Sequence, residues 1–184
     1  ICRLCDSEID QDSELWDFSI TRPRYLRRIA GKTASLFSLS LYIGAAAGGC
    51  HVQQQLLLRR IGYEIGMFFQ IQDDILDYTG KEAAMGKPAG NDLRCGLATL
   101  PLICALSRDS DGRLKRLLPV KQVISPRRTG RIVGKVIELG GVEETERTGE
   151  FYRRRAEEDI ARLGEGETAR LLLLILNKLR NRSS

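Results

Sequence analysis

The sequence contains no segment of 18 or more consecutive apolar residues. Its apolar run Leu171–Leu176 is far too short to cross a bilayer, since a membrane-spanning helix needs about 20 such residues. No transmembrane segment is therefore predicted. No signal peptide is recognisable either, and the chain starts at Ile1 rather than at a methionine. We therefore expect it to be a fragment of a longer protein.

Histidine is almost absent, and cysteine is sparse and irregularly spaced. His51 is the only histidine, and the five cysteines form a single C-x-x-C, at Cys2 and Cys5. A structural zinc site combines four Cys or His ligands at regular spacing, so one isolated pair does not favour zinc. An odd number of scattered cysteines is more typical of a reducing compartment, and we expect a cytoplasmic location.

Aromatic residues make up only 6% of a chain whose formal net charge is +5. The densest basic groups are Arg22, Arg24, Arg27, Arg28 and Arg153–Arg155. Nucleic-acid binding would require a recognition motif or interleaved aromatic residues beside such groups. Neither is present, so we interpret them as solvated helix faces and predict no nucleic-acid partner.

Helical periodicity is present along most of the chain, and no strand-like alternation accompanies it. Helices are predicted over residues 1–15, 23–47, 56–78, 100–106, 113–118, 125–139, 142–163 and 167–180. Residues 80–98 are Gly-rich and polar and are predicted to form a loop. Residues 157–159 are predicted on a solvated face, and Gly62 and Gly66 are spaced to let another helix approach. The fold class is all-α, a helical bundle, with one domain over 1–184.

Three carboxylates gather at the end of the apolar segment Leu56–Tyr78. Asp73, Asp74 and Asp77 are three and four residues apart, so they project from one side of a helix, with Gln70 one turn upstream. Their repulsion and their burial among apolar residues would both be relieved by a divalent cation. Oxygen-only ligands suit Mg2+, which takes one or two carboxylates and leaves room for substrate phosphates.

Two other interpretations of these carboxylates were weighed. A solvated acidic helix end would also carry such a cluster, and the spacing alone does not separate it from a metal site. An EF-hand loop is excluded, because Ile75 and Leu76 stand where that motif requires oxygen ligands.

The residues around the carboxylates make the sequence similar to a known family. Its second aspartate-rich region resembles Phe69–Asp77, Gly86–Pro88, Asp92–Leu93 and Thr99–Pro101, and its Lys-Thr motif resembles Gly31–Leu36. The family is that of the trans-polyprenyl diphosphate synthases, of medium- or long-chain type such as heptaprenyl or octaprenyl. The resemblance covers roughly the C-terminal half of such an enzyme and implies a bundle of the isoprenoid synthase type.

The resemblance implies a Mg2+-dependent prenyltransferase of isoprenoid biosynthesis. An allylic diphosphate ionises, isopentenyl diphosphate attacks the resulting cation, and a proton is lost. Asp73 would then bind Mg2+ directly, while Asp74 and Asp77 would hold it through water or order its surroundings.

The substrate-binding residues implied by the same resemblance come from both motifs. Lys32 and Lys87 would contact the allylic diphosphate. Thr33 and Gln70 would face the reacting carbons, where oxygen dipoles favour a cation, and Phe69 would line the site. Lys32, Thr33, Gln70 and Asp73 are accordingly the predicted catalytic residues.

The family's first aspartate-rich motif has no counterpart here, since Asp6, Asp10 and Asp12 are spaced differently. We therefore expect the chain alone to be inactive, and product length cannot be predicted. A non-catalytic helical subunit that supports a catalytic partner is one alternative. A class I terpene cyclase is another, although it lacks the Lys-Thr and Gly-Lys-Pro motifs. An exposed apolar patch on the helix that carries Leu36, Phe37, Leu39 and Ile43 is predicted to form a homodimer or a complex with a partner subunit.

Overall fold

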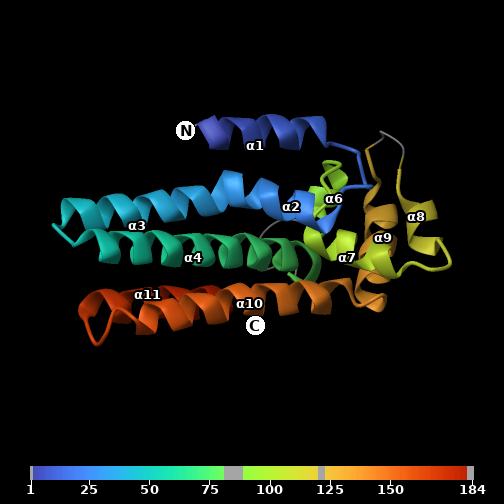
Figure 1. Ribbon diagram of the computed structural model, residues 1–184. Helices are drawn as coiled ribbons and strands as arrows, with labels where there is room; N and C mark the ends of the chain where they lie inside the picture. The colour runs from blue at the N-terminus through green and yellow to red at the C-terminus, as the bar shows by residue number, and fades with distance from the viewer. Residues whose placement is uncertain (1, 81–88, 120–122, 182–184) are drawn as a thin grey trace.

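The computed structural model describes residues 2–80, 89–119 and 123–181, and every regular element in these ranges is helical. The long helices lie side by side in an elongated bundle, with α4 between α3 and α10 (Figure 1). They are α1 (Cys2–Ser13), α2 (Arg22–Ile29), α3 (Ser35–Ala47), α4 (Val52–Thr79), α10 (Gly141–Ala161) and α11 (Glu167–Arg180). The predicted all-α bundle is confirmed. Within the described ranges no helix is both long and apolar enough to cross a membrane.

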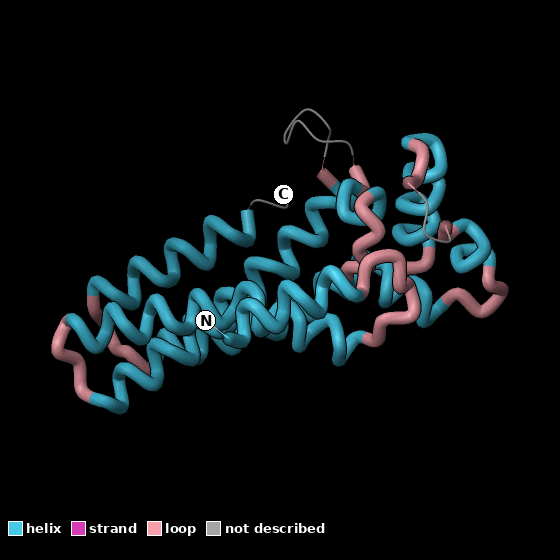
Figure 2. Tube along the Cα trace, turned by 90° about the horizontal axis from the view of Figure 1, so that it is seen from above, coloured by secondary structure: helices cyan, strands magenta, loops and turns pink. Residues whose placement is uncertain are grey.

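The remaining α-helices of the described ranges gather at one end of the bundle, beyond the C-terminal end of α4 (Figures 1 and 2). They are α6 (Asn91–Arg94), α7 (Leu100–Arg108), α8 (Arg113–Leu117) and α9 (Pro126–Glu138). Helix α6 falls inside 80–98, so the prediction of a continuous loop there was wrong. Lys87, with Gly86 and Pro88, lies outside the described residues, as do the side chains of Cys2 and Cys5.

One continuous rod runs from α2 to α3, and its middle is a π-helical turn, Ala30–Ala34. This turn holds Lys32 and Thr33. A single π-turn inside an α-helix widens the backbone locally, and such turns occur frequently at functional sites. The hydroxyl of Ser35 donates to the carbonyl oxygen of Gly31 at 2.5 Å, which satisfies a backbone acceptor within the turn.

The close approach of α3 to α4 depends on two glycines. A Cβ on Gly62 would lie 2.5 Å from the carbonyl oxygen of Phe37, and one on Gly66 would lie 2.6 Å from the Cα of Ala34. No side chain can be accommodated at such distances, so the predicted role of Gly62 and Gly66 in helix packing is confirmed. This contact fixes the π-turn against the second half of α4.

The contact between α4 and α10 contains buried charges. Asp159 is only 7% exposed and pairs with Arg60, while Glu64 is 1% exposed with Oε1 3.1 Å from Arg155. The prediction that residues 157–159 lie on a solvated face was therefore wrong for Asp159. Helix α10 packs against both α4 and α11, which leaves it a narrower solvent-facing side than its sequence suggests.

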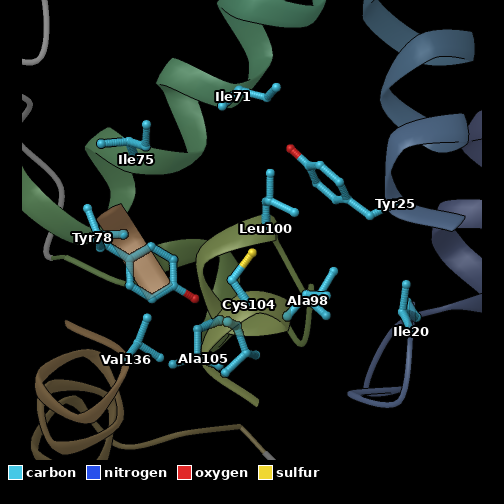
Figure 3. Packing of buried hydrophobic residues seen from close by; sticks show 14 of the residues in the cluster. Ile20, Tyr25, Ile71, Ile75, Tyr78, Ala98, Leu100, Cys104, Ala105 and Val136 are labelled. Carbon is cyan, nitrogen blue, oxygen red and sulfur yellow. The ribbon is translucent and has the colours of Figure 1, made fainter. Parts of the chain in front are cut away.

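An apolar cluster joins α2, α4, α7 and α9 at the aspartate end of α4. Figure 3 shows Tyr25, Ile71, Ile75, Tyr78 and Leu100 in this cluster, with Tyr25 reaching from α2 towards α4. The cluster holds the start of α7 beneath the last turns of α4. The position of the carboxylates is consequently set by core packing.

Candidate functional site

The three aspartates at the end of α4 lie in different environments. Asp74 is 2% exposed, and its Oδ2 accepts from the hydroxyl of Tyr25 at 2.6 Å and from the amide of Leu100 at 3.4 Å. Its Oδ1 accepts from the side-chain amide of Gln70 at 3.1 Å. Burial raises the pKa of Asp74 to about 7, against the lowering effect of the hydrogen bonds from Tyr25 and Gln70.

Asp77 is half-buried and organises the start of α6. Its two carboxylate oxygens accept from the backbone amides of Asn91 and Asp92, at 2.9 and 3.2 Å. Burial, followed by the charge of Asp92, raises the pKa of Asp77 to about 6, and the charge of Asp73 acts in the same direction. Asp73 itself is exposed. Of the three aspartates, Asp73 is thus the one whose carboxylate faces solvent, and it lies close enough to Asp77 for its charge to affect the pKa of Asp77.

The Lys-Thr turn and the aspartate region are joined directly. The hydroxyl of Thr33 donates to Oε1 of Gln70 at 2.8 Å, and Gln70 in turn donates to Asp74. Beside them the rings of Phe69 and Phe37 lie 5.4 Å apart between centroids. The structure therefore brings Thr33, Phe69 and Gln70 together with the aspartates.

Lys32 lies on the same turn but is held by α1. Its ammonium is 3.1 Å from Oε1 of Glu8 and 3.1 Å from Oε1 of Gln11. Both Lys32 and Glu8 are partly exposed, so the ion pair is a weak one that an anionic ligand could displace or join.

Sequence reasoning did not identify several residues that shape this site. Tyr25 and Glu8 had no signal of their own, because a tyrosine on an apolar face and a glutamate in an acidic helix both indicate ordinary structure. The prediction that Arg28 lies on a solvated helix face was wrong: Arg28 is 5% exposed, pairs with buried Glu14 at 2.5 Å and donates to the carbonyl of Ala98 at 2.7 Å. The hydrogen bond to Ala98 fixes the segment that delivers the Leu100 amide to Asp74.

The acidic side chains suit a metal shared with a ligand better than a metal held by protein alone. Among the described residues, no group of three or more His, Cys, Asp or Glu side chains is arranged to hold a metal ion. Asp73 and Asp77 nevertheless provide oxygen donors on the accessible side. Mg2+ is usually held by one or two carboxylates and completes its coordination with water and substrate phosphate, so the residues present fit it.

Comparison with known proteins agrees with this geometry. The model of the polyprenyl synthetase family matches residues 2–132. Component 2 of the heptaprenyl diphosphate synthase of Bacillus subtilis is 32% identical over 176 residues, which is 95% of this chain and 50% of that protein. The chain therefore spans about half the length of this curated relative.

Two solved structures have the same fold. The heptaprenyl diphosphate synthase of Staphylococcus aureus matches all of this chain and 57% of its own, with a TM-score of 0.89 and 30% identity. A polyprenyl synthase of Caulobacter crescentus, complexed with calcium and isoprenyl diphosphate, covers 99% of this chain and 56% of its own, with a TM-score of 0.89 and 28% identity. This chain belongs to the polyprenyl synthetase family.

Proposed function

We propose that the chain forms one side of the active site of a polyprenyl diphosphate synthase, which condenses an allylic diphosphate with isopentenyl diphosphate. The observation that carries the proposal is the junction between the Lys-Thr turn and the aspartate region. Thr33, Gln70 and Asp74 are linked by hydrogen bonds, and Lys32 and Asp73 are immediate neighbours of that chain of bonds. A cation on the π-helical turn and an outward carboxylate on the neighbouring helix α4 are the pair that a metal–diphosphate ligand requires.

Each side chain has a role that follows from its environment. Lys32 would exchange part of its contact with Glu8 for a diphosphate oxygen. The oxygen atoms of Thr33 and Gln70 would face the positive charge that develops as the carbon–oxygen bond of the allylic substrate breaks. Phe69 would exclude water beside them. Lys87 lies outside the described residues, and its role as a second cation rests on the sequence resemblance alone.

Asp73 would hold Mg2+ directly, with Asp77 nearby. Bound Mg2+ would neutralise charge on the departing diphosphate. Asp74 and Asp77 accept hydrogen bonds from surrounding residues, which supports ordering roles for both: Asp74 at the start of α7 and Asp77 at the start of α6. The Caulobacter structure, solved with calcium and isoprenyl diphosphate, supports a divalent cation and a diphosphate as joint ligands of this fold.

A second candidate function is that of a subunit that supports a catalytic partner. It is favoured by the similarity to a protein described as component 2 of a synthase, and by the lack of a counterpart to the family's first aspartate-rich motif in this sequence. In that case the same site would bind diphosphate only in a complex with another polypeptide.

Thermal unfolding tests the proposed site. Mg2+ and pyrophosphate together should raise the midpoint of unfolding by about 5–10 °C at concentrations well above Kd, because two ligands that bind only the folded chain stabilise it by mass action. Either alone should have a much smaller effect. Asp73→Ala should abolish the joint effect, and Glu158→Ala, at an exposed position on α10, should preserve it.

Three equal and negligible shifts with a folded wild-type chain would instead favour an acidic helix end without a ligand. If protection appears only after a partner polypeptide is added, the supporting-subunit function is the better one.

A further inference from the structure

Tyr25 makes a specific polar contact from within the apolar cluster. The residue is 1% exposed, and its hydroxyl donates to Oδ2 of Asp74 at 2.6 Å. Figure 3 shows its ring among the apolar side chains, with the hydroxyl directed towards α4. At 2.6 Å this bond is shorter than those that Asp74 accepts from Gln70, at 3.1 Å, and from the amide of Leu100, at 3.4 Å. Tyr25 is therefore one of the groups that fix the carboxylate of Asp74.

The position of Asp74 also determines which groups donate and which accept in the hydrogen bonds from Gln70 to Asp74 and from Thr33 to Gln70. Oδ1 of Asp74 accepts from the amide nitrogen of Gln70, so the amide oxygen of Gln70 faces Thr33. The hydroxyl hydrogen of Thr33 is used in that bond at 2.8 Å. Only oxygen lone pairs of Thr33 remain for a ligand, which is the polarity that a developing cation needs.

Tyr78 provides an internal comparison. It lies in the same cluster and is 3% exposed, but its hydroxyl has the side chain of Thr99 as its polar neighbour and is not among the donors to Asp74. Tyr25 and Tyr78 thus bury similar rings, and only the hydroxyl of Tyr25 is connected to Asp74.

We propose that Tyr25 is a positioning residue for the diphosphate site: it holds Asp74 inside the bundle and thereby orients Gln70 and Thr33, without touching a ligand. The inference rests on the proposed function, because it takes Thr33, Gln70 and Asp73 to face a Mg2+–diphosphate ligand. Without the hydroxyl, a buried carboxylate oxygen loses a donor, and Asp74 must turn towards other donors or towards the cation beside Asp73. The amide of Gln70 then loses its fixed orientation.

The test compares Tyr25→Phe with the matched variant Tyr78→Phe in the complete chain. Tyr25→Phe should weaken Mg2+-dependent pyrophosphate binding about tenfold, the order expected for loss of one hydrogen bond to a charged group. In 1H–15N spectra recorded without ligand, it should also move the side-chain amide signals of Gln70 and the backbone amide of Leu100. Tyr78→Phe should leave the binding and the Gln70 signals unchanged.

The outcomes separate the inference from the function on which it rests. If the wild-type chain binds Mg2+ with pyrophosphate and Tyr25→Phe binds equally well with unmoved Gln70 signals, Tyr25 only fills the core and the inference is wrong. Equal weakening by both variants would indicate general loosening of the core and would also overturn it. A wild-type chain that does not bind contradicts the proposed function itself. Should Tyr25→Phe fail to fold, 3-fluorotyrosine at position 25 can replace it, because this residue retains the ring and the hydroxyl and changes only how strongly the hydroxyl donates. The inference then requires that the Gln70 signals move. The same replacement at position 78 must leave them unmoved.

Discussion

Glu64 is a charged residue in the middle of α4, enclosed by the contact with α10. Arg155 lies 3.1 Å from its Oε1, while its Oε2 has no hydrogen-bond partner among the described residues. Burial raises the pKa of Glu64, the charge of Asp159 acts in the same direction, and Arg155 and Arg60 oppose both. The folded chain therefore binds a proton at Glu64 more tightly than the unfolded chain does.

This sign predicts how stability depends on pH. Because the pKa of Glu64 is higher in the folded state, its contribution to the free energy of unfolding is fully present below the ordinary glutamate pKa and is lost as pH rises through the raised one. The loss is limited to about 1.4 kcal/mol per pH unit. Glu64→Gln should therefore flatten the decline in stability from pH 5 to pH 8, as measured by urea unfolding, whereas Glu158→Gln should not. Parallel profiles for wild type and Glu64→Gln would contradict this.

The sequence could locate the carboxylates but could not assign them different environments. Asp73 and Asp74 are adjacent, so they project about 100° apart around the helix. Which of them points inwards depends on where α2 and α7 pack. Tyr25 and Leu100, which both donate hydrogen bonds to Asp74, are distant from it in sequence. The spacing of the aspartates therefore could not predict these contacts.

At the scale of the elements, the contact between α3 and α4 should be the most sensitive to added volume. Gly66→Ala places a methyl group 2.6 Å from the backbone of Ala34, so the helices must separate, at about 2–3 kcal/mol of the free energy of unfolding. Gly44→Ala, on α3 where an added Cβ meets nothing within 4 Å, should be neutral or stabilise by up to about 1 kcal/mol. Chemical denaturation measures both, and equal effects would exclude tight packing at Gly66.

The long helices were predictable, because their apolar periodicity and their Gly and Pro boundaries are local signals. The short helix α6 was not. Its first two amides are bound by Asp77, which lies on α4 well before it in sequence. Gly90, which precedes α6, has a φ of +76°, and a Cβ there would lie 2.6 Å from Thr129. The element is thus formed by contacts with α4 and α9 that its own residues do not reveal.

The whole molecule leaves apolar surface uncovered. Leu36, Leu39 and Ile43 on α3 are each about half exposed, at 48%, 47% and 54%. The prediction was wrong for Phe37, which is partly buried and packs against the core and the ring of Phe69. The three exposed residues are spaced one helical turn apart along a single face, which is the arrangement of a surface that packs against another helix. Association with a second copy or a partner subunit remains a prediction for this face.

The last prediction concerns catalysis by the chain as a whole. We expect that these 184 residues alone do not elongate prenyl chains. A departing diphosphate carries several negative charges, and the sequence offers a single aspartate-rich motif to stabilise it. Loss of one preorganised electrostatic element already lowers a rate on the order of 100-fold or more, and loss of a metal-binding motif should leave no measurable turnover.

Incorporation of labelled isopentenyl diphosphate measures this directly. A polypeptide that carries the family's first aspartate-rich motif, fused to the chain or added separately, should restore incorporation. Asp73→Ala should abolish the restored activity, and Glu158→Ala should retain it. Its neighbour Asp159, also an acidic residue of α10, would not serve as the control, because it is buried against Arg60 and its replacement would disturb the packing of α10 on α4. Robust turnover by the chain alone would mean that its own residues stabilise the diphosphate from both sides, and the proposal that it forms only one side of the site would be wrong.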